Sequence, residues 1–143
     1  GAFAGIGATG PTGPVGPAVP SVSALFWNSG SEHTSHNVTQ YIGWGEIFNS
    51  THEDNGAIIA PFNGTIGTLY VKLGKNVALG QNVSVNVCVD GNTVGPALII
   101  TSGNNGSIAI NQAVNAGELI AICVTGTIGT RIIASVDFTI AVV

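Results

Sequence analysis

The chain has 143 residues, of which 7% are charged, and its formal net charge is −4. With three cations, Lys72, Lys75 and Arg131, it cannot build the basic patch needed to bind nucleic-acid phosphates. No apolar run reaches the roughly 18 residues that a membrane-spanning helix needs, because charges interrupt the hydrophobic C-terminal third. A monomer with so few charges would have difficulty covering its surface, so we expect part of it to be buried against other copies of the chain.

The first 20 residues contain a collagen-like repeat. Glycine occurs at every third position, at Gly7, Gly10, Gly13 and Gly16. A collagen triple helix requires this spacing because only glycine fits at the axis where the three chains meet. No proline occupies the third position of a triplet, which favours a bacterial or viral collagen over an animal one. We predict that residues 1–20 are the end of a stalk and residues 21–143 a head, which must do most of the work of holding three chains together.

From Ser21 onward, apolar and polar residues alternate with the period of a β-strand. The clearest apolar stripes are Leu69, Val71 and Leu73; Val83, Val85, Val87 and Val89; and Ile132, Ala134, Val136, Phe138, Ile140 and Val142. Turn-forming residues separate such runs at Asp90-Gly91, Asn104-Asn105-Gly106 and Asn115-Ala116-Gly117. We count roughly eight to ten short strands and no convincing helix, which predicts an all-β sandwich or jelly roll.

A glycine-spaced stalk followed directly by a β domain rich in Ala, Val and Ile resembles the collagen-like glycoproteins of bacterial spore surfaces, of the exosporium type. Related heads cap collagen-like proteins of large viruses and phages. The residues that carry the resemblance are 7–18 and the strands at 67–73 and 83–91. It implies a jelly-roll head similar to those of tumour necrosis factor and complement C1q, assembled as a tight homotrimer at the surface of a spore, a cell or a virion. An extracellular protein can be glycosylated at Asn-x-Ser/Thr sequons. Five sequons begin at Asn37, Asn49, Asn63, Asn82 and Asn105, and some of them are expected by chance.

Two functions fit this resemblance. The leading hypothesis is structural, with the head aligning the collagen strands at the tip of a surface filament. The alternative is an adhesin whose head binds a host receptor or a carbohydrate, because jelly rolls serve both roles. Trp44, between Gly43 and Gly45, is the candidate for stacking on a sugar. We expect no enzyme activity and no cofactor, because the sequence has neither a serine nucleophile elbow nor paired carboxylates in an evident cleft context.

One polar segment, residues 32–54, holds four of the seven acids and all three histidines, His33, His36 and His52. Imidazole and carboxylate groups together can bind zinc or another divalent ion. We favour solvated loops flanking a strand region at residues 41–48, because His-x-x-His outside a helix has no fixed ligand geometry. If a metal binds, these three histidines are the first candidates.

The two cysteines, Cys88 and Cys123, lie on the less bulky faces of their predicted strands. Cys88 alternates with the valine stripe, and Cys123 alternates with Ile122 and Val124. The two residues could be neighbours in one sheet. A disulfide would suit an extracellular fibre, and two buried thiols are the equal alternative.

Overall fold

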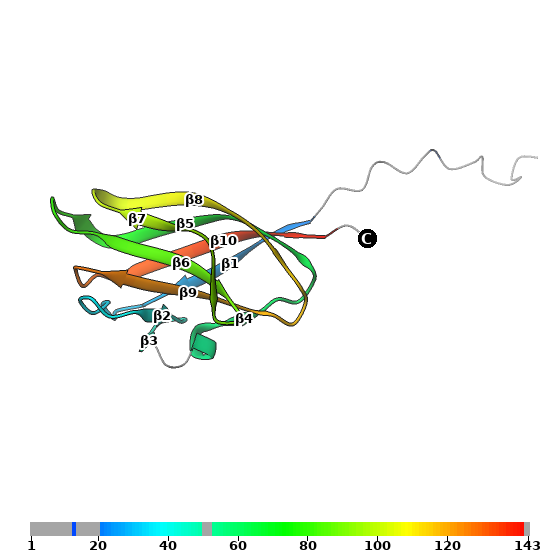
Figure 1. Cartoon of the computed structure of the whole chain (residues 1–143), viewed down its shortest axis with the longest axis horizontal. Coiled ribbons are helices and arrows are strands. Elements are labelled where there is room, and N and C mark those ends of the chain that lie inside the picture. The colour runs from blue at the N-terminus through cyan, green and yellow to red at the C-terminus, as the bar shows by residue number, and fades with distance from the viewer. Residues whose placement is uncertain (1–12, 14–20, 50–52, 142–143) are drawn as a thin grey trace, which may run out of the picture.

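The computed structural model describes residues 13, 21–49 and 53–141, so the predicted stalk, apart from Gly13, lies outside the described residues. The described chain contains ten β-strands and one short 3-10 helix, η1 (Figure 1). None of its helical segments is long and apolar enough to cross a membrane. The elements are β1 Val22–Asn28, β2 Gln40–Ile42, β3 Ile47–Asn49, η1 Glu53–Gly56, β4 Ile58–Ile59, β5 Gly64–Val77, β6 Val83–Val89, β7 Asn92–Ile100, β8 Gly103–Val114, β9 Leu119–Gly126 and β10 Ile132–Ile140.

The strands form two antiparallel sheets that pack face to face. Sheet A has the order β1-β10-β5-β8, and sheet B has the order β3-β2-β9-β6-β7, with β4 pairing at the opposite end of β9 from β2. Successive strands often belong to different sheets, as when β5 in sheet A is followed by β6 in sheet B (Figure 1). This crossing between sheets makes the head a jelly-roll β-sandwich, and the predicted all-β fold class is confirmed.

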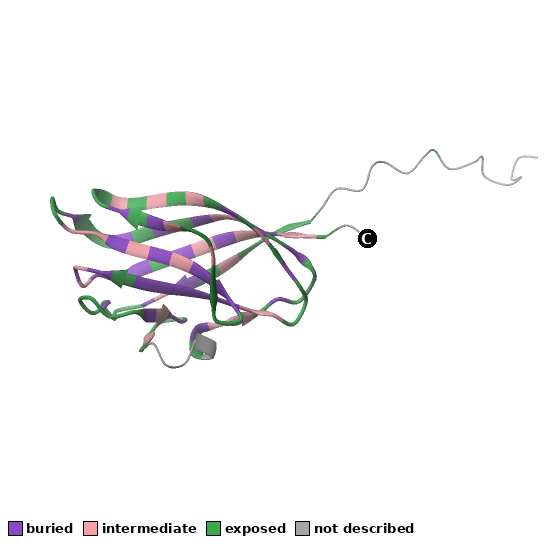
Figure 2. Ribbon diagram, viewed as in Figure 1, coloured by how far each residue is buried: buried purple, intermediate pink, exposed green. Residues whose placement is uncertain are grey.

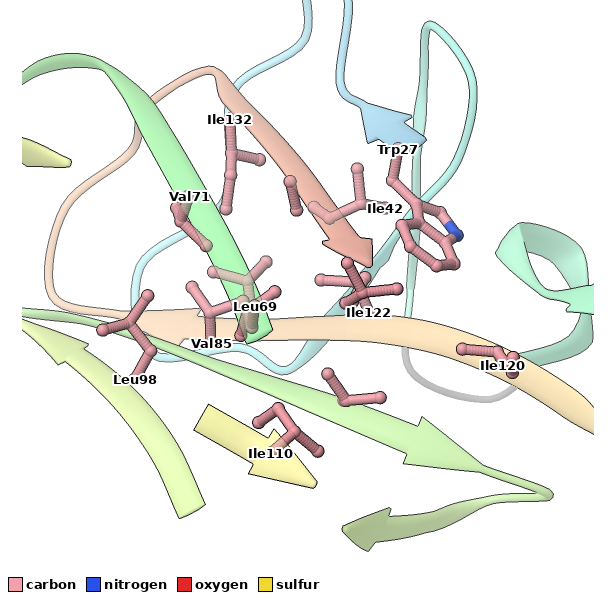
Figure 3. Close-up of a cluster of buried hydrophobic side chains, with 14 of the residues drawn as sticks. Trp27, Ile42, Leu69, Val71, Val85, Leu98, Ile110, Ile120, Ile122 and Ile132 are labelled. Carbon is pink, nitrogen blue, oxygen red and sulfur yellow. The ribbon is translucent and has the colours of Figure 1, made fainter. Parts of the chain in front are cut away.

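The hydrophobic core lies between the sheets and is built from the predicted stripes (Figure 3). In β5, Leu69, Val71 and Leu73 are buried, whereas Tyr70 and Lys72 point outward. The alternation is visible along the ribbons in Figure 2. Fully burying such a side chain contributes about 1.5–3 kcal/mol. In the other two predicted stripes, Ile140 is half-buried and Val142 lies outside the described residues. The remaining members of these stripes are buried: Val83, Val85, Val87, Val89, Ile132, Ala134, Val136 and Phe138.

Two of the three predicted turns are confirmed. Asp90 and Gly91 join β6 to β7 with φ angles of 48° and 85°, which suit a type I′ hairpin. The turn between β8 and β9 contains Gly117, whose φ is 91°. The predicted turn at 104–106 was wrong, because these residues belong to β8, in which Asn105 and Gly106 pair with β5. The chain turns earlier, just before Gly103, which adopts a φ of 68°.

A bulge bends β5 at Gly67. The pairing of β5 with β8 and its pairing with β10 both slip at this level. Asp137 on β10 has no register partner on β5 and accepts a hydrogen bond from the Thr68 amide at 3.2 Å. A Cβ at position 67 would displace the Asp137 carboxylate, so glycine at this position leaves room for the hydrogen bond to the Thr68 amide.

Candidate functional site

The outer face of sheet A, which points away from sheet B, carries exposed apolar side chains. Val22 and Phe26 on β1, Tyr70 on β5 and Ile133 on β10 are between 49% and 66% exposed. Ser135 on β10 lies opposite both Phe26 and Tyr70, so the two aromatic residues share one row across the sheet. We call these four apolar residues and the surface between them the sheet A face. Large apolar side chains clustered on an exposed surface mark an interaction site.

The sheet A face is hollowed as well as apolar. Two hollows of about 340 and 300 Å³ lie on it and share Lys72 and Ile133 in their walls. Arg131 lines the first hollow, and Tyr70 lines the second. The surface is therefore irregular enough for protruding side chains of another molecule to fit into it.

Two cations lie at one end of the sheet A face. Lys72 pairs with Ile133, and the Gly74 amide donates to the Arg131 carbonyl at 2.8 Å, so Lys72 and Arg131 are diagonal neighbours on the sheet. Lys72 donates a long hydrogen bond of 3.5 Å to Asn104 Oδ1. Among the residues that the structure describes, no carboxylate forms an ion pair with either cation. The face is thus apolar in its middle and cationic at this end.

A second unusual surface is the edge formed by β7 and β8, which we call the β7–β8 edge. β7 is the last strand of sheet B, β8 is the last strand of sheet A, and the two are consecutive in the chain. Residues 92–117 contain no charged side chain. Ile99 on β7 is 59% exposed. Exposed edge strands usually carry charges that prevent pairing with other chains, so a long uncharged edge favours a covered position.

The cysteines lie on the outer face of sheet B, in a small cluster separate from the main core. Cys88 on β6 and Cys123 on β9 are buried beside Ala121, with Tyr41 and Ala57 packed against them. Their Sγ atoms are 3.3 Å apart and share a hydrogen bond. The prediction that both cysteines occupy the less bulky faces of neighbouring strands is confirmed.

Hydrogen bonding with Cys88 lowers the pKa of the Cys123 thiol below its usual value, and burial opposes this shift. At a given pH, Cys123 is therefore more readily converted to the thiolate than an ordinary cysteine.

The predicted metal ligands are only partly described. His33 and His36 lie in the loop between β1 and β2, where His36 forms an isolated bridge with Gly126. His52 lies outside the described residues. Within the described ranges, no group of three or more His, Cys, Asp or Glu residues is placed to hold a metal ion. The zinc hypothesis therefore gains no geometric support from this part of the chain.

Trp44, the predicted sugar-stacking residue, lies in the hairpin between β2 and β3 and is 55% exposed. Its indole Nε1 donates to the Phe26 carbonyl at 3.2 Å, which fixes it beside β1 and the sheet A face. Of the other aromatic residues in the first half of the chain, Trp27 is in the core and Phe62 is exposed.

Sequence reasoning did not single out Phe26 or Ile133. The sequence did carry a signal for them. Trp27 and Ala134 face the core, so the large apolar side chains next to them in the strands, Phe26 and Ile133, must point outward.

The geometry defines a jelly-roll domain with an apolar face and an uncharged edge. No protein-family model and no curated protein matches the sequence. Among solved structures, the chain is similar to a family 35 carbohydrate-binding module from Clostridium thermocellum, with a TM-score of 0.45, 19% identity and coverage of 87% of this chain and 100% of that one. It is also similar to a chain in the structure of infectious bursal disease virus Gx strain, with a TM-score of 0.40 and 15% identity. That similarity covers 91% of this chain but only 36% of the viral one.

Proposed function

We propose that the chain is the trimerising head of a collagen-like surface fibre and that its role is structural. The observation that carries this proposal is the sheet A face, where Phe26, Tyr70 and Ile133 are about half exposed or more. A second copy seated on this face would remove these side chains from water, at about 25 cal/mol for each Å² of apolar surface. The cores of protein interfaces are likewise apolar and poor in charge.

The β7–β8 edge is the surface that best complements the sheet A face. It carries the exposed Ile99 and has no charge that would be lost from water on burial. An edge on one copy that meets a face on the next is a heterologous contact, which closes into a ring when the rotation between copies permits. The glycine-spaced triplets require three chains, so the ring that serves them has three members.

The position of β1 supports a link between the head and the stalk. β1 begins at Val22, directly after the predicted stalk, and forms an edge of sheet A. Three heads joined through this sheet would bring three stalks together and raise their local concentration, which favours winding of the triple helix. In this proposal the head has no catalytic role and no cofactor, and it lies outside the cell, on the surface of a spore, a cell or a virion.

Sedimentation equilibrium or light scattering of the purified chain at micromolar concentration tests the proposal. We expect a mass three times that of the 14.3 kDa chain. A stable, well-folded monomer under these conditions would overturn it.

A glycan-binding head is the second candidate, favoured by the exposed Trp44 fixed beside Phe26. An exposed aromatic ring that is held in place can stack on the apolar face of a sugar. In this case we expect the chain to bind specific sugars on a glycan array and Trp44→Ala to abolish the signal. Phe62→Ala, which removes another exposed aromatic ring, is the matched control and should leave binding unchanged. Absence of binding by the wild-type chain would reject this candidate.

A further inference from the structure

The buried thiol pair on the outer face of sheet B is placed for a covalent reaction. Asn86 on β6 pairs with Cys123 on β9, and Cys88 pairs with Ala121, so the two cysteines are diagonal neighbours on adjacent strands. Their sulfur atoms are 3.3 Å apart, and a disulfide bond is about 2.05 Å long. Rotation of the two side chains can close a gap of this size without moving the strands apart or changing their register.

The hydrogen bond between the two sulfurs favours formation of a thiolate within the pair. The hydrogen bond with Cys88 lowers the pKa of Cys123, so the thiolate forms there more readily. The thiolate is the reactive form of cysteine toward oxidants. The Cys123 thiolate can therefore act as the nucleophile, and Cys88 Sγ, 3.3 Å away, is positioned to resolve the first product.

A small reagent can reach the pair without unfolding the core. The cysteines are 3% and 7% exposed, and the side chains packed over them are Tyr41 and Ala57. These residues come from short elements, the three-residue β2 and the segment between η1 and the two-residue β4. Short elements at a surface open locally at a lower free-energy cost than the sandwich as a whole.

We propose that Cys88 and Cys123 are a modification site at which a hydroperoxide closes an intramolecular disulfide between the central strands β6 and β9 of sheet B. In the first step, the Cys123 thiolate attacks a peroxide oxygen, the O–O bond breaks, and Cys123 becomes a sulfenic acid while the other oxygen leaves as water or an alcohol. In the second step, the Cys88 sulfur attacks Cys123 Sγ, the S–OH bond breaks, and water leaves with the Cys88 proton. The two thiols lose two electrons in total, and the peroxide gains them.

The bond would stabilise the head by restricting the unfolded chain. The cysteines are 35 residues apart in sequence, and closing a loop of this length removes substantial conformational entropy from the unfolded state. For a chain of this size we expect the melting temperature to rise by about 10 °C on oxidation and to return to its starting value on reduction. The site lies on sheet B and does not depend on the proposed trimer.

Intact mass spectrometry of the reduced chain treated with hydrogen peroxide tests this proposal. We expect the monomer mass to fall by two hydrogen atoms, with loss of both alkylatable thiols under denaturing conditions. In Cys88→Ser, the sulfenic acid on Cys123 has no resolving thiol, so we expect the mass to rise by one or more oxygen atoms instead. Cys123→Ser likewise leaves one thiol without a partner, so it should also gain oxygen and form no intramolecular disulfide.

Other outcomes would overturn the proposal. These are an unchanged wild-type mass with two alkylatable thiols, a gain of oxygen in the wild type, or a disulfide between two chains. A disulfide that forms without raising the melting temperature would reject the stabilising role. Apart from the disulfide between two chains, these results do not depend on the number of chains in the assembly, so they leave the proposed trimer untouched.

Discussion

Replacing Tyr70 with serine tests whether the sheet A face holds copies of the chain together. Tyr70 lies on β5, next to Ser135 on β10 in the pairing of the sheet, and its side chain points away from the core. The monomer should therefore tolerate the change, because substitutions at exposed strand positions cost at most about 1 kcal/mol.

The effect on assembly follows from the area that Tyr70 leaves exposed. Tyrosine presents about 150–250 Å² of surface, and 49% of this residue is exposed, so about 80 Å² of apolar surface is available for burial. At about 25 cal/mol per Å² this amounts to about 2 kcal/mol for each contact, or about 6 kcal/mol for a ring of three. The concentration of half-dissociation varies as the square root of the trimer dissociation constant. It should therefore rise about a hundredfold.

Fluorescence-detected sedimentation over a dilution series measures this concentration, and circular dichroism checks that the variant is folded. Leu79→Ser is the matched control, because Leu79 is fully exposed in the turn between β5 and β6 and lies on neither proposed surface. It should not change the dissociation concentration. If Tyr70→Ser dissociates at the same concentration as the wild type, or if both variants shift equally, the sheet A face is not the contact.

Two further predictions concern the stability of the head, and urea unfolding measures both. Trp27 is fully buried, and its Nε1 donates to the Gly56 carbonyl at 2.7 Å. Trp27→Phe should cost about 2–4 kcal/mol, because it leaves a cavity and an unpaired carbonyl. Gly67→Ala should cost about 1–3 kcal/mol, because the new methyl group displaces the Asp137 carboxylate from the Thr68 amide. An unchanged unfolding midpoint in either variant would contradict the corresponding packing argument.

The inner faces of the strands could be predicted because burial selects apolar residues at every second position. The valines of β6 are an example, since all four face the core. The same alternation placed both Cys88 and Cys123 on the face of their strands that points away from the core, as the structure confirms. The alternation along one strand shows which face a residue occupies, but it does not show which residue of another strand lies next to it. The separation of 3.3 Å between the sulfurs depends on the pairing of β6 with β9, which no local pattern specifies.

Two features of the structure were not predicted from the sequence, for different reasons. The run Asn104-Asn105-Gly106 has the composition of a turn, yet it lies within β8, because Gly103 takes the left-handed conformation that the turn needs. The sheet A face was missed because a single strand shows only which positions point outward. Phe26, Tyr70 and Ile133 become one surface only when β1, β10 and β5 are placed side by side.

The two unusual surfaces constrain the mode of assembly more strongly together than either does alone. If two copies joined edge to edge through β8, sheet A would be extended and the edge would be covered, but Tyr70 and Ile133 would stay in water. If two copies joined face to face, the apolar side chains would be buried, but the uncharged strands of residues 92–114 would remain open to pairing with other chains. A closed ring in which each edge meets the next face covers both surfaces in every copy. We therefore propose a ring as the mode of assembly, and the predicted collagen-like spacing at residues 7–16 is the reason for proposing three members.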